Sequence, residues 1–340
     1  MRECFLHTYR CRLTFAKQPM NSLLHKTGCT FAATARAAHL AVLLCSVLTA
    51  PAMATDIPIG DAANYAVLYS GQGSGTQLSI SNVTINGNIG VGGTASVADS
   101  GPSSLGGRVD FSAANTGQFH NTNGGNVGPT KVNYSQSNVT ADLSLLRTLS
   151  DNLGGVAGTS VSLLNAATQT INAASGQLYT SQGVTYRVFN ISSVQDQNGQ
   201  ILTINGDGSG APVVFNFQGS ANLQGAINLA GLTDDQVLWN FTGGSNGSSG
   251  PTLSLNNNAS SHPAQYWHGT LLDPNGAVSL VNANLDGRVF GGGIYNMQIV
   301  SGDTINAPPS HQIPEPATPF LLLAGTILMW LARRAPGKRR

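Results

Sequence analysis

The stretch LSISNVTINGNIGVGG, residues 78–93, alternates apolar and polar residues and ends in a run of glycines. It aligns without gaps on VSLVNANLDGRVFGGG, residues 278–293. The identical pairs are Ser79/Ser279, Asn82/Asn282, Gly87/Gly287, Gly92/Gly292 and Gly93/Gly293. Alternation places one set of side chains inward and the other in water, as in a β-strand with one buried face. The repeat predicts two coils of one stacked structure, close in space although far apart in sequence.

The same pattern extends over residues 55–306, which hold 38 of the 41 glycines. Short apolar runs such as ILTI (201–204), VVFNF (213–217) and LSL (253–255) are separated by Gly and Asn. Frequent sharp turns between short strands are typical of the coils of a solenoid. We therefore predict an all-β fold, a right-handed parallel β-helix or solenoid.

One segment breaks this pattern. Val139, Leu143, Leu146, Leu149 and Leu153 recur at helical spacing between residues 137 and 154, and a Gly-Gly pair follows. The spacing predicts one amphipathic helix of about four turns. We expect its apolar stripe to lie along the flank of the solenoid and to cover exposed β edges.

The N-terminal region reads as an export signal. Basic residues precede an apolar run over residues 37–50, and Ala52 and Ala54 form the small-x-small pattern that signal peptidase cleaves. We expect a signal peptide over residues 1–54, with Thr55 as the first mature residue. Met20 is the alternative start, because it gives a leader of ordinary length.

The C-terminal region carries a second signal. Pro314, Glu315 and Pro316 precede an uncharged apolar segment, residues 320–332, and Arg333 and Arg334 follow it. Thirteen residues rise only about 20 Å as a helix, short of a hydrocarbon core of about 30 Å. The segment predicts a short transmembrane helix that holds the chain at the inner membrane before processing.

Charge and cysteine content exclude several functions for the part between these signals. Residues 55–313 contain five Lys or Arg, thirteen Asp and no Glu, a net charge of −8, and all four Cys lie before residue 55. An acidic surface repels phosphate backbones, so we expect no nucleic-acid partner. A domain without Cys forms neither a disulfide nor a thiolate metal site.

The C-terminal motif resembles the PEP-CTERM sorting signal, in which a Pro-Glu-Pro tripeptide, a short apolar helix and a basic end follow in order. The resemblance covers residues 314–340. It implies that an exosortase recognises the tripeptide and detaches the tail during delivery to the cell surface or extracellular matrix. The alternative from the residues alone is a simple C-terminal membrane anchor.

The ectodomain, residues 55–306, resembles the choice-of-anchor A family, whose members join an exported domain to the surface anchor of their host. The motifs that carry the resemblance are ANYAVL (63–68), GNIGVGG (87–93), QVLWNF (236–241), GTLL (269–272) and LDGRV (285–289). Their order, with the helix, resembles more distantly the secreted microbial ice-binding β-solenoids. A linker, residues 307–313, joins this ectodomain to the sorting signal.

The candidate ligand residues are few. Tyr266, Trp267 and His268 form a cluster of aromatic and imidazole side chains that could present a platform to a ligand. No third ligand completes a zinc site there, so we predict no such metal site. Asp196 and Asp207 lie in turns that could offer oxygens to calcium, with Asx turns as the alternative.

No catalytic residue can be named, and we predict a protein that is not an enzyme and needs no cofactor, with calcium as the alternative. The expected function is structural or adhesive, with polysaccharide or a cell-surface ligand as partner. One alternative is ice binding, which calls for a ladder of outward Thr. The threonines that could form one, Thr76, Thr84, Thr203 and Thr252, are scattered and in no firm register. The other is an extracellular polysaccharide hydrolase, which calls for two close Asp in a cleft.

Overall fold

The computed structural model describes residues 55–122, 127–163, 168–194, 199–244 and 250–309. In these residues the chain forms a parallel β-solenoid with three faces, here called A, B and C, and one long helix. The parallel solenoid with one helix confirms the predicted fold class. The right-handed sense stays a prediction.

Face A carries the longest run of paired strands. Its neighbours pair in parallel, apart from the outlying hairpin strand β12 (Gln177–Ser181), which pairs antiparallel with the first half of β13. Along the stack the strands are β10 (Thr159–Leu163), β13 (Val184–Val194), β15 (Val213–Phe217), β18 (Val237–Phe241), β20 (Trp267–Asp273), β22 (Asn284–Gly291), β1 (Tyr65–Tyr69), β4 (Asn88–Val91), β7 (Val109–Ser112) and β9 (Val132–Gln136).

Face B is a parallel sheet of seven strands. Along the stack these are β16 (Ala221–Leu223), β19 (Thr252–Leu255), β21 (Ala277–Val281), β23 (Met297–Val300), β2 (Gln77–Ser81), β5 (Ser96–Ser100) and β8 (Phe119–Asn121).

Face C joins two groups of short strands through the first halves of β20 and β22. One group is β11 (Thr168–Asn172), β14 (Ile201–Asn205) and β17 (Ala226–Ala230); the other is β24 (Thr304–Asn306), β3 (Thr84–Asn86) and β6 (Ser104–Leu105). The 3-10 turns are η1 (Gly60–Asn64), η2 (Ala173–Ser175) and η3 (Asp234–Gln236).

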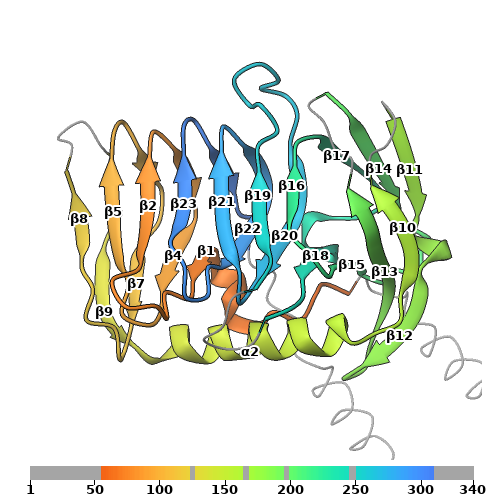
Figure 1. Ribbon diagram of the computed structural model, residues 1–340, viewed down its shortest axis with the longest axis horizontal. Helices are drawn as coiled ribbons and strands as arrows, with labels where there is room; N and C mark the ends of the chain where they lie inside the picture. The colour runs from red at the N-terminus through yellow and green to blue at the C-terminus, as the bar shows by residue number, and fades with distance from the viewer. Residues whose placement is uncertain (1–54, 123–126, 164–167, 195–198, 245–249, 310–340) are drawn as a thin grey trace, which may run out of the picture. The chain divides into compact units, whose positions relative to one another are not determined.

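The order of coils along the stack differs from the order along the chain. The first strand, β1, lies between β22 and β4, so the last coils of the chain stack directly on the first ones. Figure 1 shows this as orange strands beside blue ones in the middle of the solenoid. The chain therefore enters and leaves the stack in its middle, and both ends of the stack are built from internal segments.

The sequence repeat occupies equivalent places in two coils. Val278 pairs with Met297, which pairs in turn with Leu78. The turn residues Asn82 and Asn282 both have a left-handed backbone, with φ of 54° and 53°, a conformation that Asn tolerates better than most residues. The two copies thus pack in equivalent ways, and one coil lies between them in the stack.

Gly93 and Gly293 close the two copies of the repeat for a steric reason. A Cβ at Gly93 would lie 1.9 Å from the carbonyl oxygen of Gly71, and one at Gly293 would lie 2.5 Å from that of Asn275. Both residues also have positive φ, which Gly adopts without strain. The glycine runs therefore allow the coil corners to stack closely.

The helix α2 spans Ser137–Gly154, the range that the sequence predicted. Val139, Leu146 and Leu153 are buried on its inner side. It packs against β7, β15, β18 and β20, so it covers the outer surface of face A. The expectation that it covers β edges was wrong, because its stripe meets apolar side chains that point outward from the middle of the sheet.

Face A is consequently buried on both sides. One apolar core fills the solenoid, and a second, which includes Leu68, Val214, Leu238 and Phe290, lies between face A and α2. Strands β1, β15 and β18 are buried at every position. This explains why their sequences are almost continuously apolar, as expected for strands covered on both faces.

Aromatic rings stack along the inside of the solenoid. Phe189, Phe215 and Trp239 occupy matching places in β13, β15 and β18. Their ring centroids lie 5.3 Å and 4.5 Å apart, and the ring of Trp267 lies 4.9 Å from that of Trp239. Offset stacking at these distances adds to the free energy gained from burying the rings.

Arg288 ties the entry and exit points of the chain together. Its side chain is fully buried and forms an ion pair with Asp235 of η3. Its Nε donates to the Ala63 carbonyl at 3.2 Å, and its Nη2 donates to the Pro308 carbonyl at 2.8 Å. The first and last described segments are thus held at one corner, between faces A and C.

The predicted export and sorting residues lie outside the described part of the chain. This applies to Ala52 and Ala54, to the Pro314-Glu315-Pro316 motif and to Arg333 and Arg334. Among the described residues, no helix has both the length and the apolar character needed to cross a bilayer.

Candidate ligand-contact surface

A single row of side chains runs along the middle of face B. Each member pairs with the next across neighbouring strands, and each is exposed or half-exposed. The row is Asn222, Ser254, Ser279, Gln298, Ser79, Ala98 and His120. Six strand spacings of about 4.8 Å make the row about 29 Å long.

The strands of face B present no Asp, Glu, Lys or Arg side chain at the surface. Asp99 is the single charged residue in its seven strands, and its side chain is buried inside the solenoid. Along the row the outward groups are hydroxyls, amides, one methyl group and the imidazole of His120, and the polar ones can donate and accept hydrogen bonds without an ionic partner. Such a surface suits a ligand that is itself neutral and rich in hydrogen-bonding groups.

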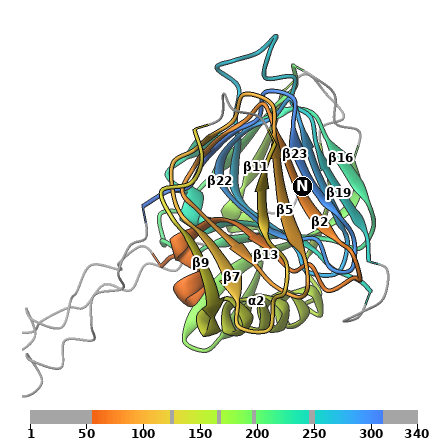
Figure 2. The ribbon, with the colours of Figure 1, turned by 90° about the vertical axis from the view of Figure 1, so that its left-hand side faces the viewer.

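Face B is also more regular than face A. The pairings of its described strands run in unbroken register, whereas face A has register shifts at β1, β10 and β7. Figure 2, which looks along the stack, shows face B and α2 on different sides of the solenoid. The helix therefore leaves face B open, with a fixed spacing between its side chains.

Face C differs in charge. His268 contacts Asp234 at 2.8 Å, and Asn306 donates to Asp286 at 2.7 Å. Asn86 in turn donates to Asn306 at 2.8 Å. These side chains bond to one another along the stack, and face C therefore presents carboxylates at its surface where face B presents none.

The predicted aromatic platform at residues 266–268 was wrong for its central residue. Trp267 is fully buried and belongs to the aromatic stack inside the solenoid. Tyr266 and His268 are half-exposed, and the His268 ring is held by Asp234. Because Trp267 points inward while its neighbours point outward, the three side chains do not form one surface.

The predicted calcium residues are not brought together. Asp207 forms an ion pair with Arg187, with Nε 2.8 Å from Oδ2, and accepts from the Ser209 backbone N–H at 2.9 Å. This is the Asx-turn alternative, since the carboxylate already has a cation and a turn donor. Asp196 lies outside the described residues. Within the described ranges, no group of three or more His, Cys, Asp or Glu could hold a metal ion.

Two buried aspartates hold backbone turns and do not face one another as the carboxyl pair of a polysaccharide hydrolase would. Asp273 and Asp303 are buried in different coil corners, where burial raises their pKa to about 8 and about 7. Their Oδ1 atoms accept from the backbone N–H of Gly276 at 2.8 Å and of Ala283 at 2.6 Å. Both carboxyls thus fasten backbone turns inside the fold.

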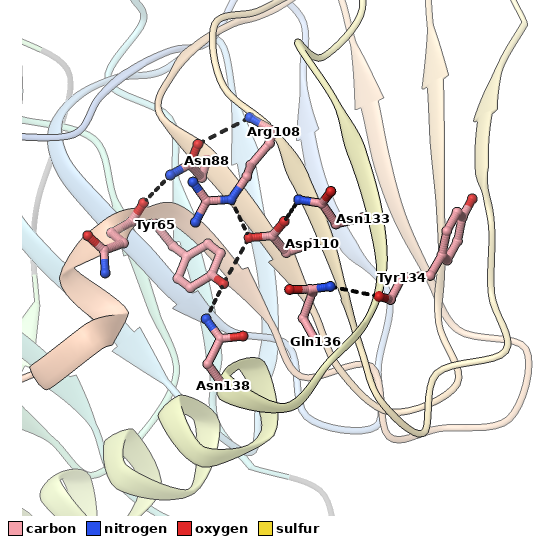
Figure 3. A network of polar contacts seen from close by, with 9 residues as sticks. Tyr65, Asn88, Arg108, Asp110, Asn133, Tyr134, Gln136 and Asn138 are labelled. Atoms are coloured by element: carbon pink, nitrogen blue, oxygen red, sulfur yellow. Dashed lines mark hydrogen bonds and ion pairs between the residues drawn. The ribbon is translucent and has the colours of Figure 1, made fainter.

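A polar network at the start of α2 is structural. The Tyr65 hydroxyl donates to Asp110 at 3.1 Å, Arg108 Nε donates to Asp110 at 2.7 Å, and Asn133 donates to Asp110 at 2.7 Å. Asn138 at the start of the helix donates to the Tyr65 hydroxyl at 3.1 Å. As Figure 3 shows, Tyr65, Arg108 and Asn133 converge on Asp110, and Asn138 of α2 joins the network through Tyr65. Burial, with Asp110 beside it, raises the pKa of Tyr65, so its hydroxyl stays protonated.

Sequence reasoning did not single out the row on face B. Its signal was present, because Ser79 and Ser279 are identical members of the quoted repeat and occupy its outward positions. Alternation fixes which residues point outward, but it does not tell which face of a solenoid a strand belongs to. The pairing of distant strands was needed for that step.

The fold defines the class of protein: a parallel β-solenoid with one face covered by a helix and one open face without Asp, Glu, Lys or Arg at its surface. The family comparison agrees with this class. A family model described as "Putative Ice-binding-like adhesive domain" matches residues 47–300. Because the match covers most of the chain, the protein belongs to this family of ice-binding-like adhesive domains.

Solved structures of similar proteins are ice-binding proteins. One, from the Antarctic ascomycete Antarctomyces psychrotrophicus, is 16% identical with a TM-score of 0.46, and the match covers 75% of this chain and 100% of that one. Another, from an Arctic yeast, is 17% identical with a TM-score of 0.42, covering 77% and 97%. A third, from an Antarctic Flavobacteriaceae bacterium, is 16% identical with a TM-score of 0.42, covering 78% and 52%. No curated protein matches this chain in sequence.

Proposed function

We propose that the protein is an exported adhesive protein that contacts its ligand through face B. The observation that carries the proposal is the uncharged row of seven outward side chains in unbroken register. Membership in a family of adhesive domains supports it. Many weak contacts at a fixed spacing add up when the ligand repeats as well, which favours multivalent binding over a single pocket.

The ligand class follows from the groups on this face. Hydroxyl and amide side chains such as Ser279, Gln298 and Ser79 can exchange hydrogen bonds with the hydroxyls of a neutral polysaccharide. A strongly anionic polymer is disfavoured, because residues 55–313 carry a net charge of −8. We therefore propose a neutral polysaccharide of the matrix or of a neighbouring cell surface as the partner.

The test places one charge on face B. In Ser79→Lys the ammonium group must lose water wherever the ligand covers it, so we expect at least a tenfold loss of binding to a neutral-glycan array. Thr84→Lys is the matched control, because Thr84 lies in the same coil but on face C. If both variants lost glycan binding equally, or if Ser79→Lys lost none, the ligand would contact a surface other than face B.

Ice is a second candidate ligand, favoured by the family's description and by the regular spacing of face B. The threonines weigh against it. Thr252 lies on face B, whereas Thr84 and Thr203 lie on face C and Thr76 precedes β2. An ice-recrystallisation assay decides between the two. If the protein inhibits ice recrystallisation, and this inhibition is lost in Ser79→Lys but kept in Thr84→Lys, the ligand of face B is ice and not a polysaccharide.

We further propose that the chain reaches this role through its two terminal signals. Cleavage after Ala54 releases the leader, and an exosortase recognises Pro314-Glu315-Pro316 while the apolar segment holds the chain in the inner membrane. The resemblances to PEP-CTERM signals and to choice-of-anchor A proteins support this route. The product is a cell-surface or matrix protein.

The sorting proposal is tested by fractionating cells that express the full chain. In Glu315→Ala we expect the protein to stay in the inner membrane with its tail uncut. Gln312→Ala, just outside the tripeptide, is the control and should be delivered normally. Normal surface delivery of Glu315→Ala would contradict the proposal and would leave the contact surface on face B unaffected.

A further inference from the structure

A cleft of about 400 Å³ lies beside α2, away from face B. Three segments form it: Pro58 before the first strand, one flank of the helix from Ala141 to Leu153, and the hairpin of β12 and β13 near Gln182. Its volume falls within the range of about 300–1,000 Å³ that is typical of small-ligand sites. Neither the segment that contains Pro58 nor the hairpin takes part in the proposed contact surface on face B.

The cleft combines an apolar wall with a polar rim. Leu145 and Leu149 of the helix and Tyr186 of β13 supply the apolar side. Leu145 is 42% exposed, which is unusual for a Leu in the described part of the chain, and Tyr186 is buried. Ser144 of the helix and Gln182 of the hairpin add a hydroxyl and an amide to the lining. A ligand in this cleft therefore needs both an apolar surface and hydrogen-bonding groups.

The lining carries no formal charge. None of its residues is Asp, Glu, Lys, Arg or His. Burial, with Tyr179 nearby, raises the pKa of Tyr186 to about 12, so the phenol stays neutral. An ionic ligand would lose hydration here without gaining a counter-charge, which is costly. The chemistry selects against phosphates, carboxylates and ammonium compounds.

The walls of the cleft are fixed before any ligand arrives. The end of α2 that borders the cleft is fastened to face A by a row of buried amides. Ser150 donates to Asn240 at 2.6 Å, Asn240 donates to Asn216 at 2.9 Å, and Asn216 donates to the Leu153 carbonyl at 2.8 Å. A preformed site avoids part of the ordering cost of binding.

We propose that this cleft binds one unit of a neutral saccharide. A sugar ring presents C–H groups on one side, which pack on Leu145 and Leu149 beside the buried Tyr186, and hydroxyls at its edge, which reach Ser144 and Gln182. The site is separate from face B, so it gives the protein a second point of contact, which recognises individual sugar units rather than a repeating surface.

Saturation-transfer NMR on the purified full chain tests the proposal with D-glucose, N-acetyl-D-glucosamine and cellobiose as neutral probes and D-glucuronate as the charged one. We expect at least one neutral probe to bind and D-glucuronate to bind at least tenfold more weakly. Ser144→Trp, which fills the cleft from an exposed helix position, should weaken binding at least tenfold. Thr140→Trp is the matched control, because Thr140 is exposed on the same helix but does not line the cleft.

Asn152→Trp is a second blocking variant, in case Ser144→Trp unfolds, and the melting temperature of each variant reports on folding. Binding lost in Ser144→Trp and kept in Thr140→Trp supports the site. The proposal is overturned if no neutral probe binds, if binding survives both blocking variants, or if a detergent monomer or a second copy of the chain competes for the cleft while the sugars do not. None of these substitutions lies on face B. If the cleft does not bind sugars, the proposed adhesion through face B is therefore still tested by Ser79→Lys alone.

Discussion

Faces A and B are built from the same kind of strand, yet their sequences differ. Val213–Phe217 on face A is buried at all five positions, whereas Gln77–Ser81 on face B alternates between buried and half-exposed. The cause is α2, which covers face A and leaves face B open. The comparison teaches that a continuous apolar strand in this chain marks a covered face, and that an alternating one marks a surface that water or a ligand can reach.

The largest expected effect comes from the layer between α2 and face A. Leu238 is fully buried in this layer. We expect Leu238→Ala to lower the free energy of unfolding by about 2–5 kcal/mol, because a cavity remains under the helix. Urea denaturation measures this change. A loss below about 1 kcal/mol would mean that the helix does not pack as described.

The amide row should matter next. Asn240 accepts from Ser150 and donates to Asn216, and it is completely buried. We expect Asn240→Ala to cost about 1–3 kcal/mol, because its partners lose their hydrogen bonds in a dry environment. Amide hydrogen exchange should quicken in α2 before it does in face B. Equal quickening on the two faces would show that the row does not specifically hold the helix.

Asp142 should make the covered face depend on pH. It lies on the inner side of α2, and burial, followed by repulsion from Asp61, raises its pKa to about 6. Its proton is therefore held more tightly in the folded state than in the unfolded one. This contribution is complete below about pH 4 and is lost as the pH rises through about 6.

Asp142→Asn should accordingly stabilise the protein at pH 7 by on the order of 2 kcal/mol and flatten the dependence between pH 4 and 6. Melting temperatures measured across this range provide the check. Asp151→Asn is the control, because Asp151 is exposed on the same helix. An unchanged pH profile in Asp142→Asn would show that this carboxyl is not responsible.

The smallest effect on stability is expected on face B. Ser279 points outward in the middle row, and its side chain makes no contact that the fold needs. Ser279→Ala should change the free energy of unfolding by no more than about 0.5 kcal/mol. Calorimetry compares it with Leu238→Ala. A loss comparable to that of Leu238→Ala would remove the distinction between the two faces.

Much of this arrangement could be predicted from the sequence. The alternation predicted a stacked parallel fold, the Val139 to Leu153 spacing predicted the bounds of α2, and the repeat predicted two coils with equivalent packing. These features depend on local periodicity and turn chemistry, which a sequence carries directly. The predicted bounds of the helix and the predicted equivalence of the two solenoid coils therefore agreed with the structure.

The sites were harder to predict because they depend on pairing across the stack. Trp267 looked like a surface aromatic beside Tyr266 and His268, but the strand direction turns it inward onto Trp239. Asp207 looked like a calcium ligand until Arg187, twenty residues earlier, was seen beside it. The ion pair of Arg108 and Asp110 could have been predicted, because residues two apart in an extended segment point to the same side. The sequence alone does not tell on which face of the solenoid a side chain lies, because that depends on which strands pair.

The insertion of β1 between β22 and β4 has a consequence for how such domains can change in length. Both outermost coils are built from internal segments, while Arg288 fastens the first and last described segments at the middle of the stack. Coils can thus be gained or lost at either extremity without disturbing where the domain is joined to its neighbours. The reach of face B is then adjustable in steps of one strand, about 4.8 Å, each step being a whole coil such as the 20 residues from Ile89 to its partner Val109.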